Sequence, residues 1–199
     1  MISRPTIYRA GVLTVVAFLV TACIGGRSPT VKFYNLSPTV AATPTGAEAG
    51  PAIAVGPVIF PRSLRRSQIV IRTGPNSVTV DEFHRWSGSL ESDFLDTLGA
   101  DLGALLETDR VSVYPAEAGF PVDYRVGLQV ERFDGAPGGT LVLSVRWTVT
   151  AESSSEAAAV GYSVIEEAVA GDTVEDLVRA HDAAVGRLSK DIADRIRSL

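Results

Sequence analysis

The sequence is poor in the residues from which disulfides and metal centres are built. Among its 199 residues, Cys23 is the only cysteine, and His84 and His181 are the only histidines. One thiol excludes an intrachain disulfide and a multi-cysteine zinc or iron–sulfur site, and two histidines argue against a histidine-rich metal centre. We therefore expect neither a metal ion nor a cofactor.

Lysine is also scarce, since Lys32 and Lys190 are the only two, and no block of basic residues occurs. The 18 basic residues are outnumbered by 23 acidic ones, which gives a net charge of −5. Because phosphate neutralisation supplies most of the affinity for nucleic acid, nucleic-acid binding is not expected. The composition, 46% hydrophobic and 21% charged, is that of a globular domain and excludes collagen-like, coiled-coil and wholly disordered chains.

The first segment of the chain has the pattern of a secretory signal peptide. Arg4 and Arg9 precede an apolar run over residues 10–20, which is shorter than the about 20 residues that a membrane span needs. The run leads into Leu19-Val-Thr-Ala-Cys23, which resembles a bacterial lipobox. The resemblance implies cleavage immediately before Cys23 and fatty acylation of that residue. The alternative is ordinary cleavage nearby, which would leave a free thiol.

Acylation of Cys23 would divide the chain into three parts. Residues 1–22 would be the signal peptide, residues 23–30 a flexible tether and residues 31–199 the folded domain, and the mature chain would carry a net charge of −7. Since each buried methylene contributes about 0.8 kcal/mol, several acyl chains hold a protein on a membrane durably. Ile24 follows the cysteine in place of an aspartate, which by resemblance to Gram-negative sorting rules implies the periplasmic face of the outer membrane.

The hydrophobic patterning of the remaining chain predicts a single α+β domain. Period-two alternation and β-prone runs predict strands over residues 31–36, 52–60, 68–72, 77–80, 111–114, 123–133, 140–150 and 160–169. Apolar residues at helical spacing predict one helix from Phe83 to Thr108 and another from Thr173 to Ile196. We expect a mainly antiparallel or mixed sheet with both amphipathic helices packed on one face. The pair Gly56-Pro57 predicts an edge position or a bulge in its strand.

Candidate catalytic groups are few and isolated. Ser163 lies in Gly161-Tyr-Ser-Val-Ile165, which lacks the second glycine of a nucleophile elbow and alternates like a strand. His181 falls near the apolar stripe of the last predicted helix, where packing is its expected role. His84 follows two acidic residues that could orient its imidazole, but no nucleophile is close in the sequence. We therefore predict no catalytic residue.

An arginine-rich turn is the candidate contact site. Arg62, Arg65 and Arg66 follow the second predicted strand, and guanidinium groups bind carboxylates and phosphates well. The turn could meet lipid headgroups or an acidic patch on a partner, or it could be a solvated loop with scattered ion pairs. Trp86 could also anchor a partner, although its predicted apolar face favours a place in the core.

Short motifs occur in a fixed order after Cys23. They are Phe33-Tyr-Asn-Leu-Ser-Pro38, Ile53-Ala-Val-Gly-Pro-Val58, Leu64-Arg-Arg66, Gln68-Ile-Val70, Arg85-Trp86, Asp123-Tyr-Arg-Val126 and the strand that contains Trp147. The ordered set resembles the ABC-type transport auxiliary lipoproteins, typified by the lipoprotein of the paraquat-inducible (Pqi) system. Leu64 and Arg85 belong to these motifs, and together with the arginine-rich turn and Trp86 they complete the candidate contact site.

The resemblance implies a role in transport and not in catalysis. Such lipoproteins sit on the outer membrane and work with a periplasmic mammalian-cell-entry (MCE) protein and, in many systems, an ABC permease and ATPase. These assemblies move phospholipids or other hydrophobic molecules between membranes, and the chain would dock one at the outer membrane. Two alternatives remain: a structural or assembly lipoprotein without a transport link, and a periplasmic hydrolase whose cleft would join His84 to a distant nucleophile. Self-association as a homo-oligomer is left open.

Overall fold

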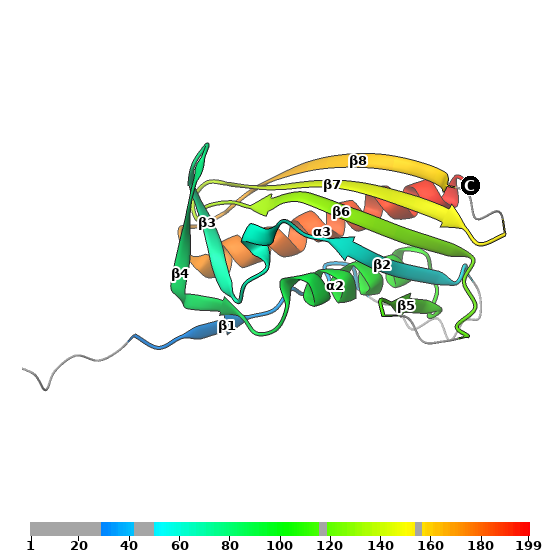
Figure 1. Ribbon diagram of the computed structural model, residues 1–199, viewed down its shortest axis with the longest axis horizontal. Helices are drawn as coiled ribbons and strands as arrows, with labels where there is room; N and C mark the ends of the chain where they lie inside the picture. Colours follow the sequence, from blue (N-terminus) through cyan, green and yellow to red (C-terminus); the bar gives the residue numbers. More distant parts are fainter. Residues whose placement is uncertain (1–28, 42–49, 116–118, 154–156) are drawn as a thin grey trace, which may run out of the picture. The chain divides into compact units, whose positions relative to one another are not determined.

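Strands and helices follow one another in the predicted order of strands, helix, strands, helix (Figure 1). The computed structural model describes residues 29–41, 50–115, 119–153 and 157–199. The elements are β1 (Lys32–Tyr34), β2 (Ile53–Ile59), the 3-10 helix η1 (Arg62–Leu64), β3 (Gln68–Gly74), β4 (Ser77–Trp86), α2 (Leu90–Leu105), β5 (Val111–Val113), β6 (Tyr124–Asp134), β7 (Thr140–Ala151), β8 (Ala157–Ala168) and α3 (Val174–Arg197).

The larger of two sheets has the strand order β5-β2-β6-β7-β8. β2 runs parallel to β5 and β6, whereas β6, β7 and β8 form an antiparallel meander. The helices α2 and α3 contact each other and cover one face of this sheet, α2 over β2 and β5 and α3 over β7 and β8 (Figure 1). The arrangement confirms the predicted α+β class, with a mixed sheet and both helices on one face.

The core lies between this sheet and the two helices. The inward face of β7 consists of Leu141, Leu143, Val145, Trp147 and Val149, all at most 7% exposed. From α3, Leu177, Leu188 and Ile192 are fully buried against it. Because burial of each such side chain contributes about 1.5–3 kcal/mol, this stripe holds α3 firmly on the sheet. A capping box between Thr173 and Asp176 begins the helix, at the predicted position.

The helix predicted from Phe83 was placed too early, because residues 83–86 extend β4 and α2 begins only at Leu90. β4 is the central strand of the second sheet, which has the order β1-β4-β3, and it pairs in parallel with β1 and antiparallel with β3. The four-residue interval between Trp86 and Leu90 imitates a helical repeat. Trp86 nevertheless points inward from a strand and packs edge-on against His181, with ring centroids 5.4 Å apart. Hydrogen bonding to two neighbouring strands outweighs the helical spacing here.

The Gly56-Pro57 pair marks a bulge in β2. β2 lies between β5 and β6, and its register with β6 shifts between Val55 and Val58. Gly56 has a φ of +107°, and a Cβ atom there would lie 2.6 Å from the Cβ of Tyr114. Both the left-handed backbone and the close approach require glycine. The bulge interpretation is confirmed. β5 pairs only with Ile53–Val55, so beyond the bulge β2 pairs with β6 alone.

Residues 36–40, which follow β1, are bound to both helices by carboxylates. Asp101 of α2 accepts hydrogen bonds from the backbone N–H groups of Thr39 and Val40, each at 3.0 Å. Asp182 of α3 accepts one from the N–H of Ser37, also at 3.0 Å. Desolvation by burial raises the pKa of both carboxyl groups, that of Asp182 to about 6. The chain immediately after β1 is thereby fixed against α2 and α3.

Candidate functional site

The arginine-rich turn consists of the 3-10 helix η1 (Arg62–Leu64) and the two arginines that follow it, and it lies between β2 and β3. The N–H groups of Leu64 and Arg65 donate to the carbonyl oxygens of Pro61 (3.0 Å) and Arg62 (3.3 Å). Leu64 is only 5% exposed and anchors the turn in the core. Arg62, Arg65 and Arg66 are all exposed, so the turn holds three guanidinium groups at the surface.

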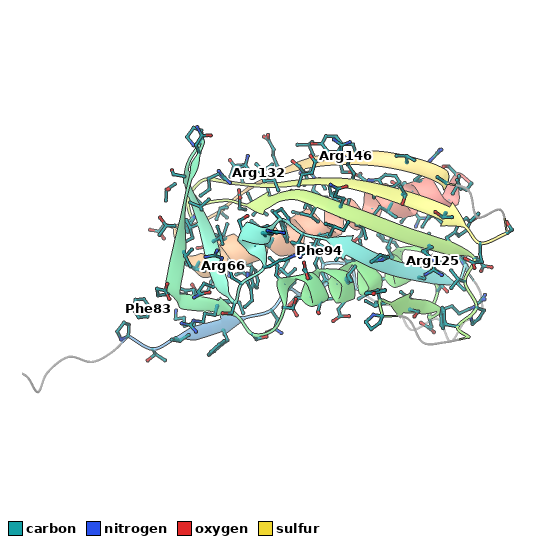
Figure 2. All side chains as sticks on the ribbon, in the orientation of Figure 1. Arg66, Phe83, Phe94, Arg125, Arg132 and Arg146 are labelled. Carbon is teal, nitrogen blue, oxygen red and sulfur yellow. The ribbon has the colours of Figure 1, made fainter. Side chains whose placement is uncertain are left out.

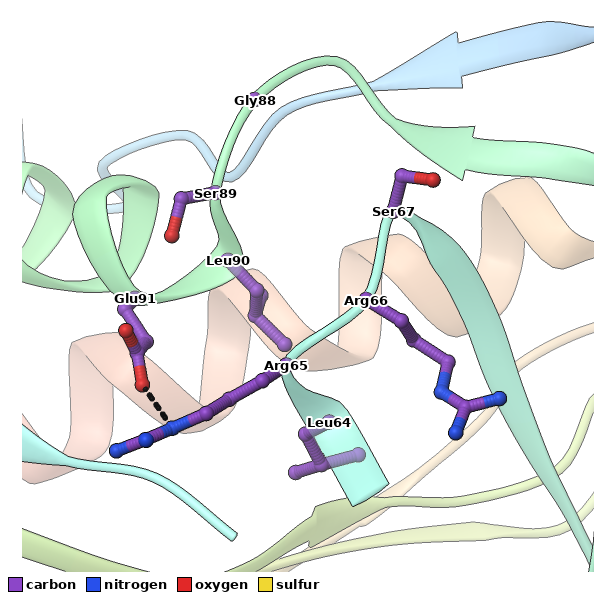
Figure 3. A pocket seen from close by; sticks show the side chains of 8 residues that line it. All are labelled: Leu64, Arg65, Arg66, Ser67, Gly88, Ser89, Leu90 and Glu91. Atoms are coloured by element: carbon purple, nitrogen blue, oxygen red, sulfur yellow. Dashed lines mark ion pairs between the residues drawn. The ribbon is translucent and has the colours of Figure 1, made fainter. Parts of the chain in front are cut away.

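A groove of about 330 Å³ lies between this turn and the beginning of α2 (Figure 3). Its lining consists of Leu64, Arg65, Arg66, Ser67, Gly88, Ser89, Leu90 and Glu91. Arg65 reaches across the groove, and its Nε lies 2.8 Å from Oε1 of Glu91. The Arg66 side chain points away from Glu91 toward β3 (Figure 3). Only one of the two lining arginines is therefore held by an acidic neighbour.

The groove has a cationic side and an acidic side. In the part of the chain that the structure describes, Arg62 and Arg66 have no carboxylate within ion-pair distance. Opposite them, Ser89 begins α2 without a side-chain cap, and Glu91 in the first turn complements the positive end of the helix. Two arginines without local partners can bind carboxylates of an acidic protein surface or phosphate groups.

The other residues of the candidate contact site are placed differently. Trp86 is 3% exposed and belongs to the core, the role that its apolar pattern favoured. Arg85 lies on β4 with its guanidinium 3.8 Å from the carboxylate of Glu82. Cys23 lies outside the described residues, as do the predicted signal peptide and most of the predicted tether. Of the candidate contact residues in the described chain, Arg62 and Arg66 are exposed and form no ion pair.

The sequence does not identify the groove residues at the start of α2, because the hydrophobic spacing predicts a helix that begins at Phe83 and not at Leu90. That placement put Ser89 and Glu91 inside a helix, whereas they form its first turn beside η1. A serine followed by acidic residues at positions 91 and 93 is a signal for a helix start, and it was present in the sequence. Only the fold, however, brings this start next to η1.

The isolated candidates for catalysis have structural partners. Ser163 lies in β8, where its hydroxyl accepts from Nε1 of Trp147 at 3.1 Å and donates to Asp191 at 2.9 Å. His181 is buried with Nδ1 2.8 Å from the carbonyl oxygen of Leu177, and desolvation lowers its pKa to about 4, so it is neutral at pH 7. Both residues occupy the packing positions predicted for them.

His84 is oriented by an acidic neighbour, although not at a helix start. Its Nδ1 lies 2.9 Å from Oδ2 of Asp81, within β4. Among the described residues, neither His84 nor His181 forms a hydrogen bond to a hydroxyl or thiol group. The described chain also contains no group of three potential metal ligands and no helix that is long and apolar enough to cross a membrane.

A sequence model of the ABC-type transport auxiliary lipoprotein component matches residues 34–193, which include the turn, the groove and both helices. The chain belongs to the ABC-type transport auxiliary lipoprotein family. The family description names a transport component and not an enzyme, which agrees with the resemblance found in the ordered motifs. No curated protein matches the chain significantly.

Solved structures share the fold of this family member. An uncharacterized protein is 19% identical with a TM-score of 0.68, and the match covers 84% of this chain and 99% of that one. Protein XCC0632 from Xanthomonas campestris, of the DUF330 family, is 16% identical with a TM-score of 0.65, covering 82% and 93%. At these identities, the similarity concerns the fold alone.

Proposed function

We propose that this chain is an outer-membrane lipoprotein that docks an MCE/ABC-type intermembrane phospholipid transport system at the periplasmic face of that membrane. The family match over residues 34–193 carries the proposal, because it names a lipoprotein that assists ABC-type transport. The partners would be the MCE-domain protein and, through it, the ABC permease and ATPase of the same system.

Membrane attachment in this proposal depends on Cys23. The lipobox-like sequence before it makes Cys23 the acylated first residue after removal of residues 1–22, and residues 23–30 tether the domain of residues 31–199. Ile24 in the position after the cysteine supports the outer membrane as its destination. The chain would then act as a fixed receptor on that membrane.

Docking would use the arginine-rich turn and its groove. Arg62 and Arg66 are exposed and have no local carboxylate in the described chain, so an acidic surface of the MCE-domain protein can pair with them. The carboxylate of Glu91 forms an ion pair with Arg65, and this pair fixes the two side chains in the lining of the groove. Charge pairing of this kind gives orientation and speed of association to an assembly that must span the periplasm.

Reversal of the charge at Arg66 tests this docking surface. Arg66→Glu is expected to reduce co-purification with the MCE-domain protein about tenfold or more, because like charges at an interface cost several kcal/mol. The matched control is Arg125→Glu on β6, since Figure 2 shows Arg125 at the other end of the sheet from Arg66. Quantitative pull-down from solubilised membranes measures the effect, and equal recovery with both variants would contradict docking through the turn.

A further inference from the structure

The small sheet has an inner face that is attached to α3. β1 and β4 pair in parallel with Lys32 opposite His84 and Tyr34 opposite Trp86, so these four side chains share one face. On that face, Glu175 of α3 accepts hydrogen bonds from Nζ of Lys32 at 2.7 Å and from the hydroxyl of Tyr34 at 2.9 Å. Phe33, between Lys32 and Tyr34, and Arg85, between His84 and Trp86, therefore point outward.

Two exposed phenylalanines lie on β1 and β4. Phe33 pairs with Arg85, so these two side chains project from the outward side of the sheet. Phe83 lies two residues before Arg85, where the register of β4 shifts and Asp81 accepts hydrogen bonds from the N–H groups of Phe83 and His84. Phe33 is 63% exposed and Phe83 is 44% exposed. Figure 2 shows Phe83 near the place where β4 meets β1, far from Arg125 of the large sheet. Neighbouring aromatic side chains left in water favour contact with an apolar surface.

The length of the tether restricts which surface this face can meet. Eight residues, 24–31, separate Cys23 from Lys32, the first residue of β1. Such a stretch spans at most about 30 Å when extended, and about 17 Å on average as a flexible chain. Because residues 36–40 are fixed to α2 and α3, β1 cannot move away from the domain to lengthen this tether.

We propose that the exposed surface of β1 and β4 that includes Phe33, Phe83 and Arg85 rests on the phospholipid bilayer into which acylated Cys23 inserts. The inference rests on the proposed function, since it requires the acyl anchor. Phenylalanine rings enter the boundary between headgroups and acyl chains, and the Arg85 guanidinium meets lipid phosphates. This second contact would fix the orientation of the domain on the bilayer.

Tryptophan fluorescence in vesicles tests the contact on the full mature lipoprotein. The protein is reconstituted through its acyl chains into vesicles of phosphatidylethanolamine and phosphatidylglycerol, with or without brominated acyl chains that quench tryptophan at close range. The native Trp86 and Trp147 are buried and give a constant background. Phe33→Trp and Phe83→Trp keep an aromatic side chain at each tested position. Val160→Trp is the matched control, because Val160 is 73% exposed on β8, an edge strand of the large sheet, whereas β1 and β4 belong to the small sheet.

The expected result is a blue shift and a loss of the added emission for the variants at positions 33 and 83 in brominated vesicles, and neither change at position 160. If the wild-type protein does not remain with the vesicles at all, the acyl anchor fails, and the proposed function and this contact fail with it. If the protein remains but positions 33 and 83 are quenched no more than position 160, the anchor stands and the contact of this face with the bilayer is refuted.

Discussion

Replacement of Cys23 by serine is expected to move essentially all of the protein from the outer-membrane fraction to the soluble periplasmic fraction. The hydroxyl of serine cannot form the thioether through which the lipid is attached, so the mature protein would lose its acyl chains. Each buried methylene contributes about 0.8 kcal/mol, so two or three chains outweigh any single protein contact with the bilayer. The proposed Phe33–Phe83 surface alone would give only weak, reversible binding.

Fractionation on a density gradient, followed by immunodetection, measures this redistribution. A matched control combines Cys23→Ser with Ser28→Cys, which restores a thiol to the tether outside the lipobox-like sequence. The control should also be soluble, because the position of the thiol and not its presence directs acylation. A Cys23→Ser protein that still fractionates with the outer membrane would show that something other than an acyl chain holds it there.

Replacement of Asp134 by alanine is expected to destabilise the domain by about 3–5 kcal/mol, because it leaves a partly buried arginine without its partner. Arg72 of β3 binds this carboxylate with both arms, Nε to Oδ1 at 2.7 Å and Nη2 to Oδ2 at 2.6 Å, and Arg132 adds a bond to Oδ1 at 2.9 Å. The Asp134 side chain is 8% exposed. The pair joins β3 of the small sheet to β6 of the large one, so its loss should loosen the attachment between the two sheets.

Urea unfolding of the Asp134→Ala protein measures the loss, and Asp194→Ala provides the control. Asp194 also pairs with two cations, Lys190 and Arg197, but its side chain is half exposed on α3, so its removal should cost at most about 1 kcal/mol. Equal losses in the two variants would contradict the structural role of the buried carboxylate.

The same ion pair has a defined pH dependence. Burial alone would raise the pKa of Asp134, but the hydrogen bonds from Arg72 and Arg132 outweigh it and lower the pKa below the usual 3.8. A carboxyl group with a lowered pKa in the folded state contributes stability above its unfolded pKa, and this contribution is lost as the pH falls through the folded value. The difference between wild type and Asp134→Ala should therefore be constant near neutrality and shrink below pH 4.

Much of the large sheet could be predicted from the sequence because most of its strands alternate. β7 buries every second residue beneath α3, and period-two patterning located β6 and β7 to within one residue and β8 to within three. The small sheet could not be predicted in this way. Its central strand, β4, is covered on one face only in part, and its last residue, Trp86, stands four residues before the helix residue Leu90. Residues 84–86 are part of a strand because they pair with β1, which is distant in the sequence. Local periodicity cannot predict such long-range pairing.

The candidate site was predictable only in part for a similar reason. The arginines of the arginine-rich turn are visible as a cluster in the sequence, and their exposure follows from the burial of Leu64 between them. Glu91 and Ser89 reach the groove through tertiary packing, and the outward position of Phe33 depends on the register between β1 and β4. The prediction for Cys23, in contrast, requires no fold, because a lipoprotein processing signal is read from the unfolded chain.

Photo-crosslinking from position 66 in the intact cell envelope tests most directly whether this lipoprotein docks a transport assembly. A photoreactive amino acid replaces Arg66 in one strain and Arg125 in another, and the proteins captured with each are identified by mass spectrometry. Docking through the arginine-rich turn predicts that an MCE-domain protein is captured from position 66 and not from position 125. Capture of barrel-assembly proteins from position 66, with no MCE-domain protein among them, would contradict the transport role and favour a structural lipoprotein.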